Sequence, residues 1–150
     1  MREVMTKSMA RNIFYGGSLF FIVIFVGLSI HSHGYIVEVS TDKAGLTESV
    51  ARGKRVWEQK ACINCHTILG EGAYFAPEVG NVMARWGVAD DPEAAFEVMK
   101  AWMDAQPTGI EGRRQMPQFH LTDEQVRDLT EFLLWTNKIR TQDWPPNDAG

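Results

Sequence analysis

The chain has 150 residues with 15 lysines and arginines against 19 aspartates and glutamates, so it has room for one soluble domain and lacks the basic balance typical of nucleic-acid-binding proteins. With 45% hydrophobic and 23% charged residues it is not a disordered chain, and two cysteines exclude a disulfide-stapled miniprotein. The charge is divided unevenly, because no formally charged residue lies between Arg11 and Glu38. Residues 1–37 carry a net charge of +2 and residues 38–150 carry −6.

The first predicted element is a transmembrane helix over about residues 13–33. Residues 13–30 are almost wholly apolar, and a helix needs about 20 apolar residues to cross a hydrocarbon core of roughly 30 Å. Tyr15 and Tyr35 stand near the two expected interfaces, which amphipathic rings prefer. The flanking positive charges lie on the N-terminal side, so the positive-inside bias predicts a cytoplasmic N-terminus. Residues 38–150 then lie outside, in the periplasm if this is a bacterial inner membrane.

A cleaved signal peptide is the alternative interpretation of this segment. Signal peptides have an apolar region of about 7–15 residues followed by a small-x-small cleavage site. Here the apolar run is longer and no convincing cleavage site follows it. The sequence therefore favours an uncleaved anchor, with residues 1–37 forming the cytoplasmic N-terminus and anchor. His31 and His33 at its outer end are interpreted as interfacial polar residues rather than metal ligands.

The outer domain, residues 38–150, begins with a polar linker over residues 38–46. Thr47 is placed to cap a first helix. The apolar residues of that helix recur at roughly helical spacing: Val50, Trp57 and Ala61. Three glycines and a proline in residues 70–82 predict a loop.

A second helix is predicted to begin at Pro92, a favourable first-turn residue, and to end by Pro107. Its apolar stripe consists of Ala95, Phe96, Met99, Trp102 and Met103. A third helix begins at Thr122, which forms a capping box with Gln125, and its inward face consists of Val126, Leu129, Phe132 and Leu133. The proline-containing tail, residues 143–150, cannot continue this helix. No stretch alternates long enough to predict a strand, so the expected fold class is all-α.

Both cysteines fall in one pentapeptide, Cys62-Ile63-Asn64-Cys65-His66, which is the haem c attachment signature. Two thiols one helical turn apart can form thioethers with both vinyl groups of one haem, and His66 then lies beneath the iron. A zinc site would need four ligands, and only His120 and carboxylates remain in the outer domain. A thioredoxin-like thiol pair expects a βαβ context, which the sequence does not show. A large apolar cofactor would also help a domain of short helices to form a core.

Met116 is the favoured second axial ligand of such a haem. It lies in a predicted loop between two helices and is followed by Pro117, so its sulfur can be held rigidly toward an iron. Thioether ligation raises the reduction potential, which suits an electron carrier. Met83, His120 and an open axial position are the alternatives, and a gap-filling role in the core is the structural alternative for Met116.

Pro77 follows His66 by 11 residues, and its carbonyl can accept the Nδ1–H of the histidine and fix the ring. The alternative is a simple loop proline. Four further side chains could reach the haem propionates, although surface or packing roles explain each of them as well: Arg85, Trp86, Arg113 and Arg114.

The C-x-x-C-H motif, the following proline and the later methionine resemble class I c-type cytochromes. Residues 62–81, CINCHTILGEGAYFAPEVGN, resemble more specifically the small cytochrome subunit of cytochrome c-dependent nitric oxide reductase. Five further segments carry the same resemblance: residues 10–21, 85–87, 107–117, 132–136 and 144–147. The resemblance therefore extends over nearly the whole chain.

The resemblance implies a membrane-anchored cytochrome with one covalent haem c. Cys62 and Cys65 would be the thioether attachments, and His66 and Met116 the axial ligands. The small subunit of this family docks on a large subunit that holds a haem b and a high-spin haem paired with a non-haem iron. Electrons come from a soluble cytochrome c or a blue-copper protein, and the large subunit reduces two NO to N2O and water in denitrification.

The same family has a structural calcium at the interface between its subunits. The resemblance makes Gly72 and Tyr74 candidates for this site, through backbone oxygens of the kind that calcium accepts. It also implies that this chain is not itself catalytic, because an iron with both axial positions filled has no place to bind substrate. The assignment of NO as the substrate comes from the resemblance alone.

Overall fold

The structure is a computed structural model that describes residues 5–142. The described residues divide into two compact units, of which the first ends at Val39 and the second begins at Ser40. The tail at residues 143–150 and the family-like segment 144–147 lie outside the described residues.

The first unit is a single long helix. Helix α1, Lys7–Tyr35, begins after Thr6, whose hydroxyl accepts the Met9 N–H at 3.2 Å, and it continues into a π-helical segment, η1, Ile36–Ser40. None of the residues of α1 is buried. By length and composition this helix can cross a membrane, and apolar side chains on all of its faces are typical of a membrane span. The predicted helix over residues 13–33 lies within it.

The second unit is mostly helical, as predicted. Its elements in chain order are α2 (Glu48–Gln59), η2 (the 3-10 helix Cys62–Asn64), β1 (Thr67–Ile68), β2 (Glu71–Gly72), α3 (Val82–Arg85), α4 (Pro92–Asp104) and α5 (Asp123–Asn137). Strands β1 and β2 pair antiparallel. The sequence predicted no strand, because two-residue strands are too short to show a period of two.

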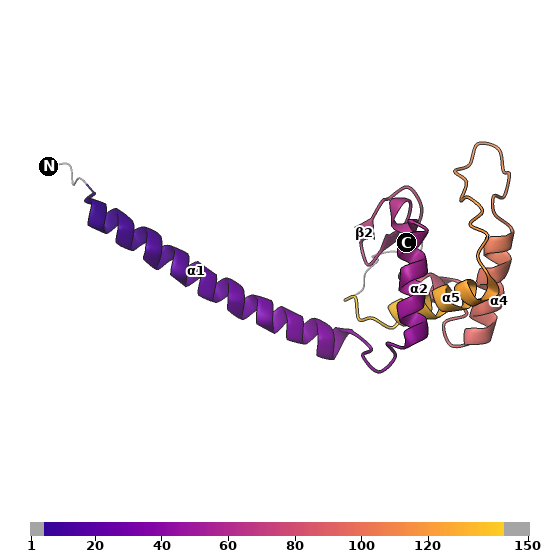
Figure 1. Ribbon diagram of the computed structural model, residues 1–150, viewed down its shortest axis with the longest axis horizontal. Helices are drawn as coiled ribbons and strands as arrows, with labels where there is room; N and C mark the ends of the chain where they lie inside the picture. Colours follow the sequence, from indigo (N-terminus) through magenta and orange to yellow (C-terminus); the bar gives the residue numbers. More distant parts are fainter. Residues whose placement is uncertain (1–4, 143–150) are drawn as a thin grey trace. The chain divides into compact units, whose positions relative to one another are not determined.

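Helix α2 crosses α5 (Figure 1), and Gly53 lies where the two helices meet. A Cβ at Gly53 would lie 1.9 Å from the Asp128 carbonyl oxygen and 2.7 Å from the Phe132 Cβ, so only glycine permits this approach. Helix α4 packs against the same α5. The core between the helices includes Val50, Trp57, Phe96, Met99, Leu129 and Leu133.

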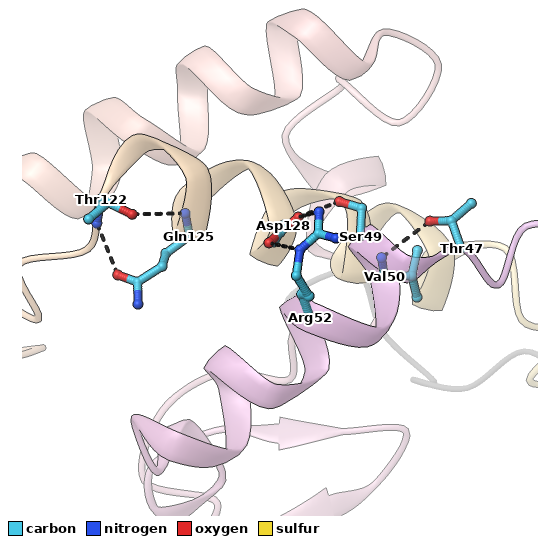
Figure 2. Close-up of polar contacts among 7 residues, drawn as sticks. All are labelled: Thr47, Ser49, Val50, Arg52, Thr122, Gln125 and Asp128. Atoms are coloured by element: carbon cyan, nitrogen blue, oxygen red, sulfur yellow. Dashed lines mark hydrogen bonds and ion pairs between the residues drawn. The ribbon is translucent and has the colours of Figure 1, made fainter.

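The predicted helix starts are confirmed (Figure 2). The Thr47 hydroxyl accepts the Val50 N–H at 3.3 Å. Thr122 and Gln125 form the predicted capping box. The Thr122 hydroxyl accepts the Gln125 N–H at 3.2 Å, and Gln125 Oε1 accepts the Thr122 N–H at 3.0 Å. Pro92 opens α4 after Asp91, whose carboxylate accepts two N–H groups of the first turn.

A buried carboxylate on α5 ties this helix to α2 (Figure 2). Asp128 accepts from Arg52 Nε at 2.7 Å, from Arg52 Nη2 at 2.8 Å and from the Ser49 hydroxyl at 2.5 Å. The hydrogen bond from Arg52 is the largest influence that holds the pKa of Asp128 below its usual value. The ionised form of Asp128 is therefore the one that the fold stabilises.

Three local predictions were wrong. Helix α2 ends at Gln59, and Ala61 is exposed with φ of 54°, so it does not extend the helical face. Trp102 was placed in the core stripe of α4 but is 45% exposed. The predicted loop over residues 70–82 also contains strand β2 and the first residue of α3.

Candidate haem site

A crevice of about 1090 Å³ lies in the second unit, slightly above the range of roughly 300–1,000 Å³ that is usual for ligand and cofactor sites. One wall is formed by residues 60–67 and 74–78, which include the C-x-x-C-H motif. The opposite wall is formed by residues from the connection between α4 and α5, together with Trp102. This connection is the orange loop that extends away from the helices in Figure 1. The crevice therefore brings together segments about 50 residues apart in sequence.

The end of α2 presents the cysteines to this crevice. Ala61 adopts a left-handed backbone conformation that turns the chain out of the helix and into η2. The Cys62 carbonyl accepts the N–H groups of Cys65 at 3.1 Å and His66 at 2.9 Å. Both cysteines line the crevice with His66, and they do not form a disulfide with each other. The donor set fits covalent attachment of a haem with one ring nitrogen at its iron.

The alternative chemistries of the motif fit less well. Burial raises the pKa of the Cys62 thiol to about 11, whereas redox-active cysteines of C-x-x-C pairs have lowered pKa values. Among residues 5–142 no group of three or more histidine, cysteine or acidic side chains could hold a metal ion, and structural zinc needs four ligands. A thiol exchanger and a zinc site therefore find no support in the geometry.

His66 is oriented by a hydrogen bond to the neighbouring segment of the same wall. Its Nδ1 lies 2.8 Å from the Pro77 carbonyl oxygen. A carbonyl can only accept, so Nδ1 carries the hydrogen and Nε2 has the lone pair available for a metal. The contact is the one expected of Pro77 from the sequence.

Glu78 is a residue of the crevice wall that the sequence analysis missed. Its side chain accepts the N–H groups of Leu69 and Gly80 at 2.8 Å and of Gly70 at 3.1 Å, and the residue is 4% exposed. Burial acts to raise the pKa of Glu78, but hydrogen bonds led by those from Gly80 and Gly70 outweigh it and leave the pKa below its usual value. Glu78 was missed because an acidic residue in a loop is normally solvated. The nearby glycines were the only sequence signal that backbone N–H groups could approach its side chain closely.

Met116 is the methionine that lines the crevice opposite His66, and it packs partly against the core. Met83 is completely buried within the core, and Met99 and Met103 are buried there too. His120 is exposed. Neither Met83 nor His120 lines the crevice. Of the axial ligands considered from the sequence, the structure places only Met116 on the same cavity as His66.

The loop that carries Met116 is held by side chains. Gln115 Oε1 accepts from the Thr108 hydroxyl and the Gly109 N–H, both at 3.1 Å. Its Nε2 donates to the carbonyls of Ile110 at 2.8 Å and Arg113 at 3.1 Å. The sequence analysis did not identify Gln115, because a glutamine in a loop carries no distinguishing pattern.

Of the four side chains considered for haem propionates, the two from this loop, Arg113 and Arg114, line the crevice. Arg114 also donates to the Phe75 carbonyl on the opposite wall, with its guanidinium 4.8 Å from the Phe75 ring centroid. Arg85 instead donates to the Glu78 carbonyl, and the Trp86 ring packs 6.0 Å from that of Trp102.

The two candidates for a calcium site lie in the loop after the motif. Gly72 has φ of +126°, and a Cβ there would lie 2.3 Å from the His66 carbonyl oxygen. Tyr74 is 74% exposed, lines the crevice and donates its hydroxyl to the Gly70 carbonyl at 3.3 Å. The close approach of the His66 carbonyl explains why a glycine is required at position 72. Calcium binding by Gly72 and Tyr74 stays a prediction.

The helices, the motif and the crevice together define a c-type cytochrome domain, and the family model for cytochrome c matches residues 50–137. Full-length relatives are more specific. The chain is 66% identical to the nitric oxide reductase C subunit of Paracoccus denitrificans, 67% to that of Cereibacter sphaeroides and 58% to that of Halomonas halodenitrificans. Each match covers 150 residues and the whole of both chains. The chain belongs to the family of nitric oxide reductase C subunits.

Proposed function

We propose that this chain is the electron-transfer cytochrome subunit of a nitric oxide reductase. It takes electrons from a soluble cytochrome c or blue-copper donor and passes them to haem b of a large catalytic subunit. There two NO, two electrons and two protons give N2O and water. The observation that carries the proposal is the crevice that joins the C-x-x-C-H motif to Met116, in a chain related over its full length to nitric oxide reductase C subunits.

The residues of the crevice have distinct roles toward one covalent haem c. Cys62 and Cys65 would hold the porphyrin by thioether bonds, and His66 Nε2 and the Met116 sulfur would be the protein ligands of its iron. Pro77 fixes the histidine ring through Nδ1, which keeps Nε2 aimed at the iron. A haem bound in this way supplies an iron that accepts and releases one electron.

The chain is proposed to be non-catalytic, because its two axial residues leave no position for NO. The reaction must then take place in the partner subunit, which carries haem b, a high-spin haem and a non-haem iron. This chain would contribute an electron-transfer haem and a surface for the donor.

Helix α1 is proposed as a single-pass anchor in the bacterial inner membrane. Its apolar side chains are exposed along its length, and the positive charges stand at its N-terminal end. By the positive-inside bias, residues 1–37 comprise the cytoplasmic N-terminus and the anchor, and residues 38–150 form the periplasmic haem domain. Gly72 and Tyr74 are proposed to contribute to a calcium site shared with the large subunit.

The proposal is tested by anaerobic NO consumption in the native complex, purified in detergent through this chain and supplied with a reduced c-type donor. The variant Met116→Leu removes the axial sulfur, and Met83→Leu removes a core sulfur at nearly constant volume. We expect rapid NO loss with the wild type and Met83→Leu, and loss of donor-driven turnover with Met116→Leu. A complex that consumes oxygen but no NO would instead identify a tethered cytochrome of another oxidase.

A further inference from the structure

The loop that carries Pro77 is attached to the C-x-x-C-H segment along its length. Three backbone hydrogen bonds join the two segments: Ala73 N–H to Ile63 O at 3.0 Å, Ala76 N–H to Cys65 O at 2.7 Å and Val79 N–H to Thr67 O at 2.9 Å. The His66–Pro77 hydrogen bond lies between the last two of these. The position of the histidine ring therefore depends on how firmly this loop is closed.

The Glu78 carboxylate closes the loop. Its Oε1 accepts the N–H groups of both Leu69 and Gly80, and its Oε2 accepts that of Gly70. These donors lie at the two ends of the segment between β1 and α3, and Glu78 itself directly follows Pro77. Glu78 is buried and is one of the residues that line the crevice, so the negative charge of its carboxylate is only partly screened from the crevice.

We propose that Glu78 is a positioning residue that holds the Pro77 carbonyl against His66 and places a fixed negative charge near the haem crevice. The inference rests on the proposed function, since it requires a haem ligated by His66. Under this inference, the reduction potential of the haem depends in part on Glu78, a loop carboxylate that does not bind the iron.

The charge acts in a definite direction. A buried anion stabilises the oxidised iron, which carries one more positive charge than the reduced iron, so Glu78 lowers the reduction potential. Arg85 donates to the Glu78 backbone carbonyl, and its positive charge interacts with the Glu78 carboxylate. Removal of the carboxylate charge leaves the Arg85 charge less compensated, which also raises the potential.

Two substitutions separate charge from geometry. Glu78→Gln removes the charge, while its amide oxygen can still accept the Leu69 and Gly80 N–H groups. Glu78→Asp keeps the charge but shortens the side chain, so it cannot reach all three donors. Glu71→Gln is the matched control, because it removes an exposed carboxylate from the same loop, where solvent screens the charge.

The experiment is a redox titration of the haem c band in full-length protein in detergent, together with NMR exchange of the His66 Nδ1–H. We expect the midpoint potential to rise in Glu78→Gln by more than in Glu71→Gln. In Glu78→Asp we expect a potential near that of the wild type and faster exchange of the Nδ1–H. Thermal unfolding of each variant shows whether faster exchange arises from local rather than global opening.

The outcomes separate this inference from the proposed function. If the wild-type protein binds no covalent haem, this result contradicts both the proposed function and the inference. Haem-loaded Glu78→Gln with an unchanged or lower potential overturns the inference alone. If Glu78→Gln takes up no haem, Glu78→Asp decides: faster Nδ1–H exchange supports the inference, and unchanged exchange overturns it.

Discussion

The two walls of the crevice are built in different ways. On the His66 side, backbone hydrogen bonds join the motif to the following loop, and the Glu78 carboxylate closes that loop from a buried position. On the Met116 side, the connection between α4 and α5 is largely exposed, and the side chain of Gln115 supplies four of its hydrogen bonds. The His66 wall is therefore stabilised by backbone hydrogen bonds and a buried carboxylate, whereas the Met116 wall is stabilised by the hydrogen bonds of one exposed polar side chain.

The difference predicts unequal stability of the two axial ligands. Hydrogen bonds between exposed groups contribute little net free energy, because water competes for them. Exposed loops with few buried contacts open before the helices and sheets that support them. The methionine should therefore dissociate from the iron under milder conditions than the histidine.

The largest expected effect comes from the helix crossing beneath the histidine wall. Gly53→Ala places a methyl group against the Asp128 carbonyl and Phe132, so we expect a loss of about 3 kcal/mol in the free energy of unfolding. Denaturant titration of the haem-loaded protein measures it. The neighbouring exposed change Lys54→Ala should alter stability by only about 0.5 kcal/mol. Equal effects of the two changes would show that the crossing does not support this wall.

The next effect concerns the partly buried ion pair at the same crossing. Asp128→Asn leaves Arg52 without its charged partner, and because Arg52 is 42% exposed we expect a loss of about 2 kcal/mol, below the range for fully buried pairs. The exposed substitution Asp90→Asn is the control.

This effect should depend on pH with a defined sign. The folded-state pKa of Asp128 is lowered, so its stabilisation is fully present above the unfolded value of about 3.9 and is lost as pH falls through the folded value. The stability difference between wild type and Asp128→Asn should therefore shrink below about pH 4. A difference that grows in acid would contradict the assigned role of the carboxylate.

The smallest expected effect on stability lies on the methionine wall. Gln115→Ala removes four hydrogen bonds from an exposed loop, so we expect a loss of about 1 kcal/mol in the free energy of unfolding. We also expect the reduced haem of this variant to bind CO, because its methionine dissociates more easily. Thr108→Val removes one of the four bonds and should have a smaller effect. A CO response as weak as that of the wild type would show that Gln115 does not hold the ligand.

Much of this arrangement could be predicted from local sequence. The caps at Thr47 and Thr122 and the start of α4 at Pro92 follow from interactions within a few residues. The motif at Cys62, Cys65 and His66 carries its chemistry in its spacing. These features could be predicted because the groups that interact are near one another in the chain.

The unpredicted features depend on contacts between distant segments. Glu78 is buried only because the loop folds back on Leu69 and Gly70, and Trp102 is half-exposed because it faces the crevice rather than the core. No local pattern distinguishes Glu78 or Trp102. Met116 was favoured over Met83 from its loop position and Pro117 alone, and the structure adds that the Met83 side chain lies in the core.

The proposed function depends above all on one crevice that holds a haem c between His66 and Met116. The most direct measurement is the absorption spectrum of the reduced full-length protein with and without CO, for the wild type, Met116→Leu and Met83→Leu. We expect a covalently bound haem in all three proteins, and a CO-induced spectral change in Met116→Leu alone. A CO response in Met83→Leu but not in Met116→Leu would contradict this ligation, and so would a wild-type haem that binds CO freely.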